Sequence, residues 1–259
     1  VHNSRWGTSS LHLPLGSQVG MERKNQMQDR LKKLGIVLMV IGVGFVVAGG
    51  VAYSMTSDGY NSLQKFSEAQ NVELAYNEDG QLVDRGTVEG AEAIMDLLEN
   101  DWGYTVIAGE LDANDPLVNT ASEYMYQMAT VTYHTLNGTQ TVVLTEDAEY
   151  NGEVFPAGTY EVAVEGRYWT DFDRMHPLEG PARSQAWSGT AHGIVGELGV
   201  GAITHSTLKL ALALAGLFAG VGLVSILTGG GLLWASGGAG KKDAKFVTDD
   251  VVDKELANA

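Results

Sequence analysis

The sequence predicts a membrane protein with two transmembrane α-helices that flank an extracytoplasmic α+β domain. The first observation is that residues 34–53 and residues 210–236 contain no charged side chain. The second is that basic residues adjoin both stretches, and the third is that the segment between them is strongly acidic. A bilayer core about 30 Å thick requires roughly 20 apolar helical residues, so each stretch is long enough to form a span.

The first stretch, "LGIVLMVIGVGFVVAGGVAY", has three interpretations. A cleaved signal peptide has an apolar region of only about 7–15 residues. A core helix at the surface of a domain shows a polar stripe, and this stretch has none. We therefore expect an uncleaved signal-anchor helix over residues 34–54, preceded by a cytoplasmic segment over residues 1–33.

The chain begins with "VHNSRWGTSSLHLPLGSQVG", which shows no clear hydrophobic periodicity. Because the first residue is Val1, either translation starts at a non-AUG codon or Met21 is the true start. We favour Met21, which would make residues 1–20 an annotation artefact, and these residues are excluded from the fold prediction.

Charge predicts the orientation of the chain, because short Lys- and Arg-rich flanks stay in the cytoplasm. Residues 55–206 hold five Lys or Arg against twenty-five Asp or Glu, a formal charge of −20. We therefore expect both termini in the cytoplasm and residues 55–206 outside the plasma membrane, followed by a second span over residues 207–236 and a tail over residues 237–259. The basic residues of the flanks are Arg23, Lys24, Arg30, Lys32 and Lys33 before the first stretch, and Lys241, Lys242 and Lys245 after the second.

Small residues at four-residue spacing predict where the spans pack. Such residues allow two helix backbones to approach closely, and the contact could join the two spans of one chain or spans of different chains. The alternative is that Gly and Ala are simply common in membrane helices. The candidate helix-packing residues are Gly216, Gly220, Ala215 and Ala219 in the second span, and Gly44 and Ala48 in the first.

Two helices are predicted in the first half of the domain. The spacing of apolar residues favours a helix over residues 87–103, capped by Thr87 and ended by a glycine. A second helix is expected to begin at Asp115 and Pro116, a residue pair typical of a helix start. It should end near residues 137–138, although a change from helix to strand near residue 130 is an alternative, because "ATVTYHTL" is β-prone.

The rest of the domain is expected to be a mixture of β-structure and helix. "NVELAYNEDGQLVDRG" predicts a hairpin around residues 79–80, and residues 139–166 predict β-structure with a turn at residues 151–152. A helix is expected from about Pro181 that continues almost without a break into the second span.

Composition excludes several classes of function. The formal net charge is −16 and the exported segment has no basic stretch, so binding to nucleic acid, which needs cations to displace counterions from phosphates, is not expected. The chain has no cysteine, which excludes disulfides, zinc–thiolate sites and thiol nucleophiles. No nucleophile motif such as G-x-S-x-G is present. We expect no catalytic residue, no cofactor and no enzyme activity.

The most suggestive polar cluster is "TDFDRMHPLEG". Asp171, Asp173 and His176 offer carboxylates and an imidazole, which suit several divalent metal ions, and His192 or His205 could join them. The alternative is structural, because an Asp-rich loop also uses its side chains for turn hydrogen bonds.

Three other polar patterns have structural readings that we prefer. "DANDPLVNTASE" resembles a calcium loop from Asp112 to Glu123, but it has a leucine where the calcium loop requires glycine. His134 is expected to be a hydrogen-bonded structural histidine. Ser188 and His192, at helical spacing, are expected at a surface or an interface.

The segments "TASEYMYQMATVTYHTLNGTQT" and "GRYWTDFDRMHPLEGPA", with the last span "THSTLKLALALAGLFAGVG", carry a resemblance. They resemble two-span bacterial envelope proteins that are often named automatically as aromatic ring-opening dioxygenases. The β-rich stretch over residues 139–166 departs from that pattern. The resemblance implies an envelope protein, and no catalytic residue is carried over from it.

The function expected from the sequence is therefore that of a non-enzymatic accessory or structural subunit. Its partners would be the lipid bilayer and either a second copy or another membrane protein, bound through the small-residue helix faces. The alternative is an extracytoplasmic domain that binds a cation or another ligand as a sensor, which the excess of carboxylates favours.

Overall fold

The computed structural model describes the backbone of residues 15–256 and the side chains of residues 22–237, apart from Ala108. Residues 1–14 and 257–259, which include most of the predicted artefact segment and the end of the predicted tail, lie outside the described residues. The chain forms two compact units. The two-helix unit comprises Val1–Ser54 and Leu212–Ala259, and the domain comprises Met55–Ala211.

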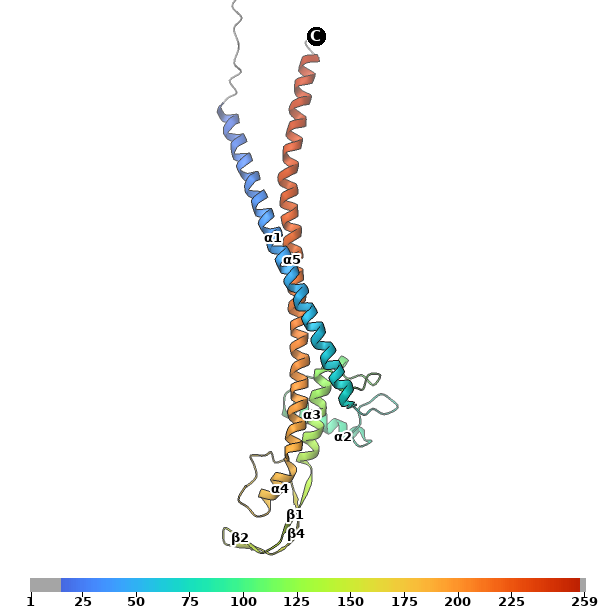
Figure 1. Cartoon of the computed structure of the whole chain (residues 1–259). Helices are drawn as coiled ribbons and strands as arrows, with labels where there is room; N and C mark the ends of the chain where they lie inside the picture. The colour runs from blue at the N-terminus through green and yellow to red at the C-terminus, as the bar shows by residue number, and fades with distance from the viewer. Residues whose placement is uncertain (1–14, 257–259) are drawn as a thin grey trace, which may run out of the picture. The chain divides into compact units, whose positions relative to one another are not determined.

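Within the described residues, two helices are long and apolar enough to cross a membrane, α1 (Leu15–Gln70) and α5 (Gly189–Leu256) (Figure 1). The core helix of a soluble protein is mostly buried. Here only 17% of the most apolar 18-residue stretch of α1 and 11% of that of α5 is buried. Two apolar helices with a small β-region between them confirm this part of the fold prediction.

In the two-helix unit, α1 and α5 run antiparallel and touch at small residues that recur every seven positions. A Cβ added to Gly42 would lie 2.6 Å from the carbonyl oxygen of Gly222, so the two backbones are in direct contact. A seven-residue repeat is the period of helices that wind around each other with a left-handed twist. The facing residues are Gly35 with Gly229, Gly42 with Gly222, and Gly49 with Ala215 and Ala219.

The helix-packing prediction therefore needs a correction. Ala215 and Ala219 do lie in the contact between the spans, but an added Cβ at Gly216 or Gly220 would meet no atom within 4 Å. The seven-residue repeat turns a different side of α5 toward α1, so these two glycines do not join the spans of one chain. Contact between different chains through this face stays a prediction. The corresponding residues of the first span also face open space, namely Gly44 and Ala48.

The first helix of the domain begins as expected and ends with a wider turn. In α2 (Val88–Asp96), the Thr87 side chain accepts a hydrogen bond from the Gly90 amide. The helix then passes into a π-helical turn, η1 (Leu97–Asp101). Gly103, with φ +67°, ends it in the left-handed conformation that glycine tolerates.

The helix expected to begin with Asp115 as its cap and Pro116 as its first residue begins five residues later, as α3 (Ala121–Leu136), with Thr120 as its cap. The predicted start is wrong for two reasons. Residues 116–118 are extended and exchange backbone hydrogen bonds with residues 72–74. Thr120 and Glu123 form a capping box, which fixes the start more firmly than a lone cap. The helix ends where predicted, at Asn137, and does not change into a strand near residue 130.

Within residues 15–256, the named strands form two antiparallel pairs, in the segment where the sequence predicts β-structure. Strand β1 (Thr139–Leu144) pairs with β4 (Gly158–Ala163), and β2 (Ala148–Tyr150) pairs with β3 (Glu153–Phe155). The two-residue loop of the inner pair has positive φ at Asn151 and Gly152, as a type I′ turn requires. The hairpin expected at residues 79–80 is also present, as an isolated bridge between Tyr76 and Leu82.

The last predicted helix is interrupted. Helix α4 (Glu179–Ala186) ends at Trp187, and α5 starts at Gly189. Trp187 leaves the helical conformation, and its indole N–H donates to the Arg167 carbonyl oxygen at 3.1 Å. Ser188 accepts a hydrogen bond from the Ala191 amide and thereby caps the new helix.

The core of the domain forms where α3 packs against α1 and α5. The Tyr124 ring lies against Gly201, where an added Cβ would be 2.5 Å from the ring, and the Tyr124 hydroxyl is 2.7 Å from the Ser67 hydroxyl. Side chains of η1 complete this core, with Leu98 fully buried. Three helices from distant parts of the sequence therefore share one apolar centre.

Candidate functional site

The structure places Asp171 in a tight turn. Its Oδ2 accepts a hydrogen bond from the Tyr168 amide at 2.8 Å, and its Oδ1 accepts one from the Thr170 hydroxyl at 3.4 Å. These are the turn hydrogen bonds expected of Asp in a loop. They fix the backbone around Tyr168.

Asp173 and His176 serve the same loop. Asp173 accepts hydrogen bonds from the Tyr150 hydroxyl and from the Met175 amide, and these interactions hold the pKa of its carboxyl below the usual range. His176 Nδ1 accepts from the amide of Leu178 at 3.1 Å. The ring of His176 also lies edge-on to the rings of Tyr150 and Phe155, which attaches the β2–β3 pair to the loop.

The three residues predicted as metal ligands therefore point to separate hydrogen-bond partners. Among the described side chains, no group of three or more His, Asp or Glu residues is arranged to hold a metal ion. His192 instead lies edge-on to Trp169, and His205 contacts α3. The geometry gives the metal prediction no support, and the structural alternative accounts for the contacts.

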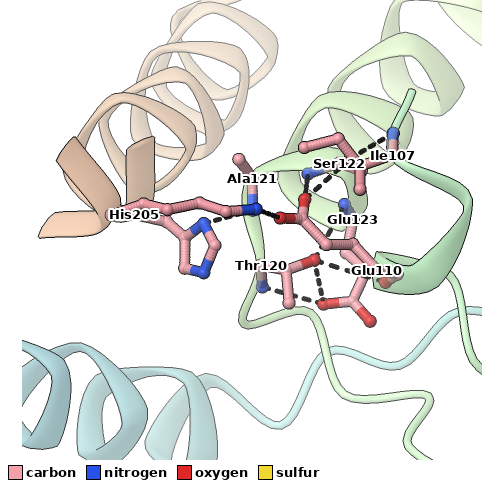
Figure 2. A network of polar contacts seen from close by, with 8 residues as sticks. Ile107, Glu110, Thr120, Ala121, Ser122, Glu123 and His205 are labelled. Carbon is pink, nitrogen blue, oxygen red and sulfur yellow. Dashed lines mark hydrogen bonds and ion pairs between the residues drawn. The ribbon is translucent and has the colours of Figure 1, made fainter. Parts of the chain in front are cut away.

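A dense polar network surrounds the first turn of α3 (Figure 2). The first N–H groups of a helix have no partner within the helix. Here three side chains from three segments accept hydrogen bonds from these N–H groups. His205 Nδ1 accepts from the Ala121 amide at 3.1 Å, Glu110 Oε2 from the Ser122 amide at 3.1 Å, and Thr120 Oγ1 from the Glu123 amide at 3.4 Å.

Glu110, at the end of the short helix η2 (Ala108–Glu110), links this network to α5. Its Oε1 accepts from the Lys209 ammonium at 2.8 Å, and its Oε2 also accepts from the Ser122 hydroxyl. Burial raises the pKa of the Glu110 carboxyl, but these hydrogen bonds outweigh burial and hold the pKa below its usual value. Glu110 is therefore ionised at neutral pH and connects α3 with α5.

His205 contributes the imidazole of the network. Its Nδ1 accepts a hydrogen bond, so the proton of the neutral ring is on Nε2. Burial lowers the pKa of His205, and the nearby Glu110 opposes this shift only in part. The Tyr60 ring covers it edge-on at 5.7 Å between centroids.

Glu123 occupies the buried side of the network. Its Oε2 accepts from the amides of Asn119 and Thr120, and burial raises its pKa above the usual value. It is only 2% exposed, so it is inaccessible to a substrate. The network is a complete set of helix caps, and its chemistry is that of a structural junction.

Within the described side chains, two tyrosines of the domain have a buried hydroxyl without a hydrogen-bond partner, the half-buried Tyr76 and the buried Tyr126. Burial raises the pKa of Tyr76 to about 12, so it stays neutral at physiological pH. His134 is hydrogen-bonded, as predicted, with Nε2 2.9 Å from Asp84 Oδ1.

An aromatic pocket that is largely open to solvent, called the aromatic cavity below, lies elsewhere in the domain and has a volume of about 620 Å³. Pockets of roughly 300–1,000 Å³ are typical of small-molecule sites. The Tyr168 and Trp187 rings stack with 5.6 Å between centroids, and the Trp102 indole N–H donates to the Tyr168 hydroxyl at 3.1 Å. The residues that line the cavity are Asp101, Trp102, Met128, Thr132, Tyr168, Trp187 and Val195.

Irregular backbone brings these residues together. Asp101 and Trp102 sit at the end of the π-helical turn, where the Trp102 amide donates to the Leu97 carbonyl oxygen. Turns of this kind occur frequently at functional sites. Tyr168 is held by the turn that Asp171 fixes.

Sequence reasoning missed this cavity. Its rings come from the end of η1, the loop after β4 and the end of α4, so no local pattern connects them. The available signal was that three of the five tryptophans of the chain fall in the irregular segments of the domain, at residues 102, 169 and 187.

No protein-family model matches the chain, and neither a curated protein nor a solved structure matches it. The resemblance to two-span envelope proteins therefore stays an expectation from the sequence. Function has to be argued from the geometry of the two units.

Proposed function

We propose that this chain is a non-enzymatic integral membrane protein of a bacterial plasma membrane that associates with another membrane protein or with a second copy. In this proposal residues 34–54 and 207–236 span the bilayer, both termini are cytoplasmic, and the acidic segment 55–206 is outside. The basic flanks and the two mostly exposed apolar helices support this arrangement.

The ion pair of Lys209 supports a boundary at the outer end of the second span. A Lys at the bilayer centre costs about 2.5–3.5 kcal/mol on insertion scales. Lys209 instead directs its ammonium to Glu110, a residue of the outer segment, at 2.8 Å. A lysine at the end of a span commonly keeps its charged group in the polar region in this way.

The observation that carries the proposed association is the open surroundings of Gly216 and Gly220. The contact between α1 and α5 already uses Gly222 and Gly229, so the first two glycines are free for another helix. Small residues at four-residue spacing are common where membrane helices meet. This face therefore suits a helix of a partner protein or of a second copy.

Crosslinking of the full chain in native membranes tests the association. The double variant Gly216→Leu/Gly220→Leu should lose the crosslinked complex, because leucine side chains hold the partner helix away. Gly231→Leu is the matched control, since it also faces open space in the same span, and it should keep the complex. The same complex in all variants would contradict the proposal.

The aromatic cavity favours a second candidate function, a ligand-binding domain outside the membrane. If a small molecule occupies the cavity in cells, native mass spectrometry of the purified full chain should show the bound mass. Val195→Trp, which places a large ring at the cavity wall, should remove that mass. An unchanged spectrum for the variant would contradict this second function.

A further inference from the structure

We infer that the aromatic cavity binds a small organic cation of the quaternary ammonium type. This inference rests on the second candidate function, because it names the class of ligand for that cavity. Three aromatic rings line it, and Asp101 is the one carboxylate among its lining residues. An organic cation satisfies both features, because it is attracted to ring faces and to a carboxylate.

The rings form a connected wall. Trp102 is hydrogen-bonded to Tyr168, and Tyr168 is stacked on Trp187 with 20° between the ring planes. Each ring is thereby held by another, so little side-chain freedom is lost when a ligand binds. The π-faces of such rings carry partial negative charge, which attracts a cation within about 6 Å of a ring centroid.

The charge around the cavity has the matching sign. No basic residue is among the lining residues. Asp101 is exposed, and no ion pair neutralises it within the described side chains. Residues 55–206 carry five basic and twenty-five acidic residues, a formal charge of −20, and an excess of one sign of charge concentrates small counter-ions near a protein. No cationic side chain lines the cavity to pair with an anion.

The neighbouring aromatic group shows that such an interaction already occurs in the domain. The Arg183 guanidinium lies over the Trp169 ring at 3.1 Å from the centroid, outside the cavity. Trp169 is therefore occupied by a cation of the protein itself. In the described part of the chain, the rings of the cavity have no such contact with a protein cation.

Calorimetry of the full chain in maltoside micelles tests the inference with two probes, choline chloride and 3,3-dimethylbutan-1-ol. The alcohol is the neutral isostere of choline, so the two differ in charge and hardly in shape. We expect choline to bind at least about tenfold more tightly, which corresponds to cation–π and carboxylate attraction of about 1.4 kcal/mol.

Matched variants locate the site. Trp102→Leu should weaken choline binding on the order of tenfold, whereas Trp169→Leu, which removes a tryptophan outside the cavity, should leave it unchanged. Asp101→Asn should weaken binding, whereas Glu99→Gln, which removes the same charge from an exposed position two residues earlier, should not. Melting temperatures of all four variants confirm that they are folded.

The outcomes separate the inference from the second candidate function. Equal binding of both probes would overturn the cation inference and support a ligand site that recognises shape. Binding of neither probe would also overturn it, and the co-purified mass in the native spectrum then decides the second function independently. Equal losses for Asp101→Asn and Glu99→Gln would contradict the assigned role of the cavity carboxylate.

Discussion

Replacing Gly42 by alanine is the sharpest test of the contact between α1 and α5. The added Cβ would lie 2.6 Å from the Gly222 carbonyl oxygen and 2.8 Å from Ile226 Cγ1. Carbon and oxygen approach to about 3.3 Å at the closest, so the backbones must separate by roughly 0.7 Å. A gap of about 0.5–1 Å forfeits a quarter to a half of the dispersion energy of the contacts that it opens.

We expect Gly42→Ala to destabilise the helix pair by about 1–3 kcal/mol, the usual cost of overpacking. Gly44→Ala is the matched control, because its Cβ would meet no atom within 4 Å. Its effect should stay within about 0.5 kcal/mol. The double variant Gly42→Ala/Gly222→Ala should cost less than the sum of the single variants, because the first Cβ already separates the helices.

Energy transfer between two dyes measures this contact. The chain has no cysteine, so Val37→Cys and Leu227→Cys provide unique labelling positions on exposed faces of the two helices. When SDS is added to separate the helices, energy transfer between the dyes should fall at a lower mole fraction of SDS in Gly42→Ala than in Gly44→Ala. If both variants open at the same SDS fraction, the backbone contact does not hold the helices together and the reasoning is refuted.

Three further predictions concern the domain, and thermal unfolding of the full chain checks each. The pKa of His205 is lowered in the folded domain, so the free energy of unfolding should fall as pH drops below the unfolded pKa of about 6.5. His205→Asn, which keeps an acceptor near the Nδ1 position, should lose this pH dependence. An equal acid response in the natural chain and in His205→Asn would exclude His205 as its cause. Thr120→Ala should cost about 1 kcal/mol through loss of the cap, and Thr120→Ser should restore most of it. Gly201→Ala should cost about 1–3 kcal/mol because the added Cβ collides with the Tyr124 ring. Gly199→Ala should be almost neutral, because its added Cβ would lie 3.8 Å from the Met128 sulfur, an ordinary contact distance.

The apolar helices could be predicted because their signal is compositional. Twenty uncharged residues have few stable conformations other than a helix that avoids water. Helix caps and turns that depend on the residue types at a few adjacent positions could also be predicted, as the cap at Thr87 and the turn at Asn151-Gly152 show. These features depend on residues within one turn of each other, which a single sequence displays directly.

The contact face of the helices was predicted only in part: Ala215 and Ala219 lie in it, but the glycines that line most of it were missed because they follow a different spacing. Four-residue spacing drew attention to Gly216 and Gly220, whereas the antiparallel pair uses glycines seven residues apart, such as Gly35 and Gly42. That repeat was present in the sequence. The period of a pattern predicts which face packs and how the helices twist, so both periods have to be examined.

The start of α3 and the aromatic cavity depend on contacts between distant segments. Residues 116–118 are extended because they pair with residues 72–74, a partner that no local pattern identifies. In the same way Trp102 and Tyr168 meet only in the folded domain, although they are 66 residues apart. Asp171 is the opposite case. The sequence pattern identified it as a candidate metal ligand, whereas in the structure its carboxylate accepts a hydrogen bond within a turn.

The central claim is that the two apolar helices span a membrane with the acidic domain outside. Single cysteines at the exposed positions Asn25 and Thr145 test it, because no natural cysteine interferes. A membrane-impermeant maleimide on intact spheroplasts should label Thr145→Cys at once, and should label Asn25→Cys only after the membrane is opened with detergent. Labelling of Asn25→Cys in intact spheroplasts, with Thr145→Cys protected, would contradict the account.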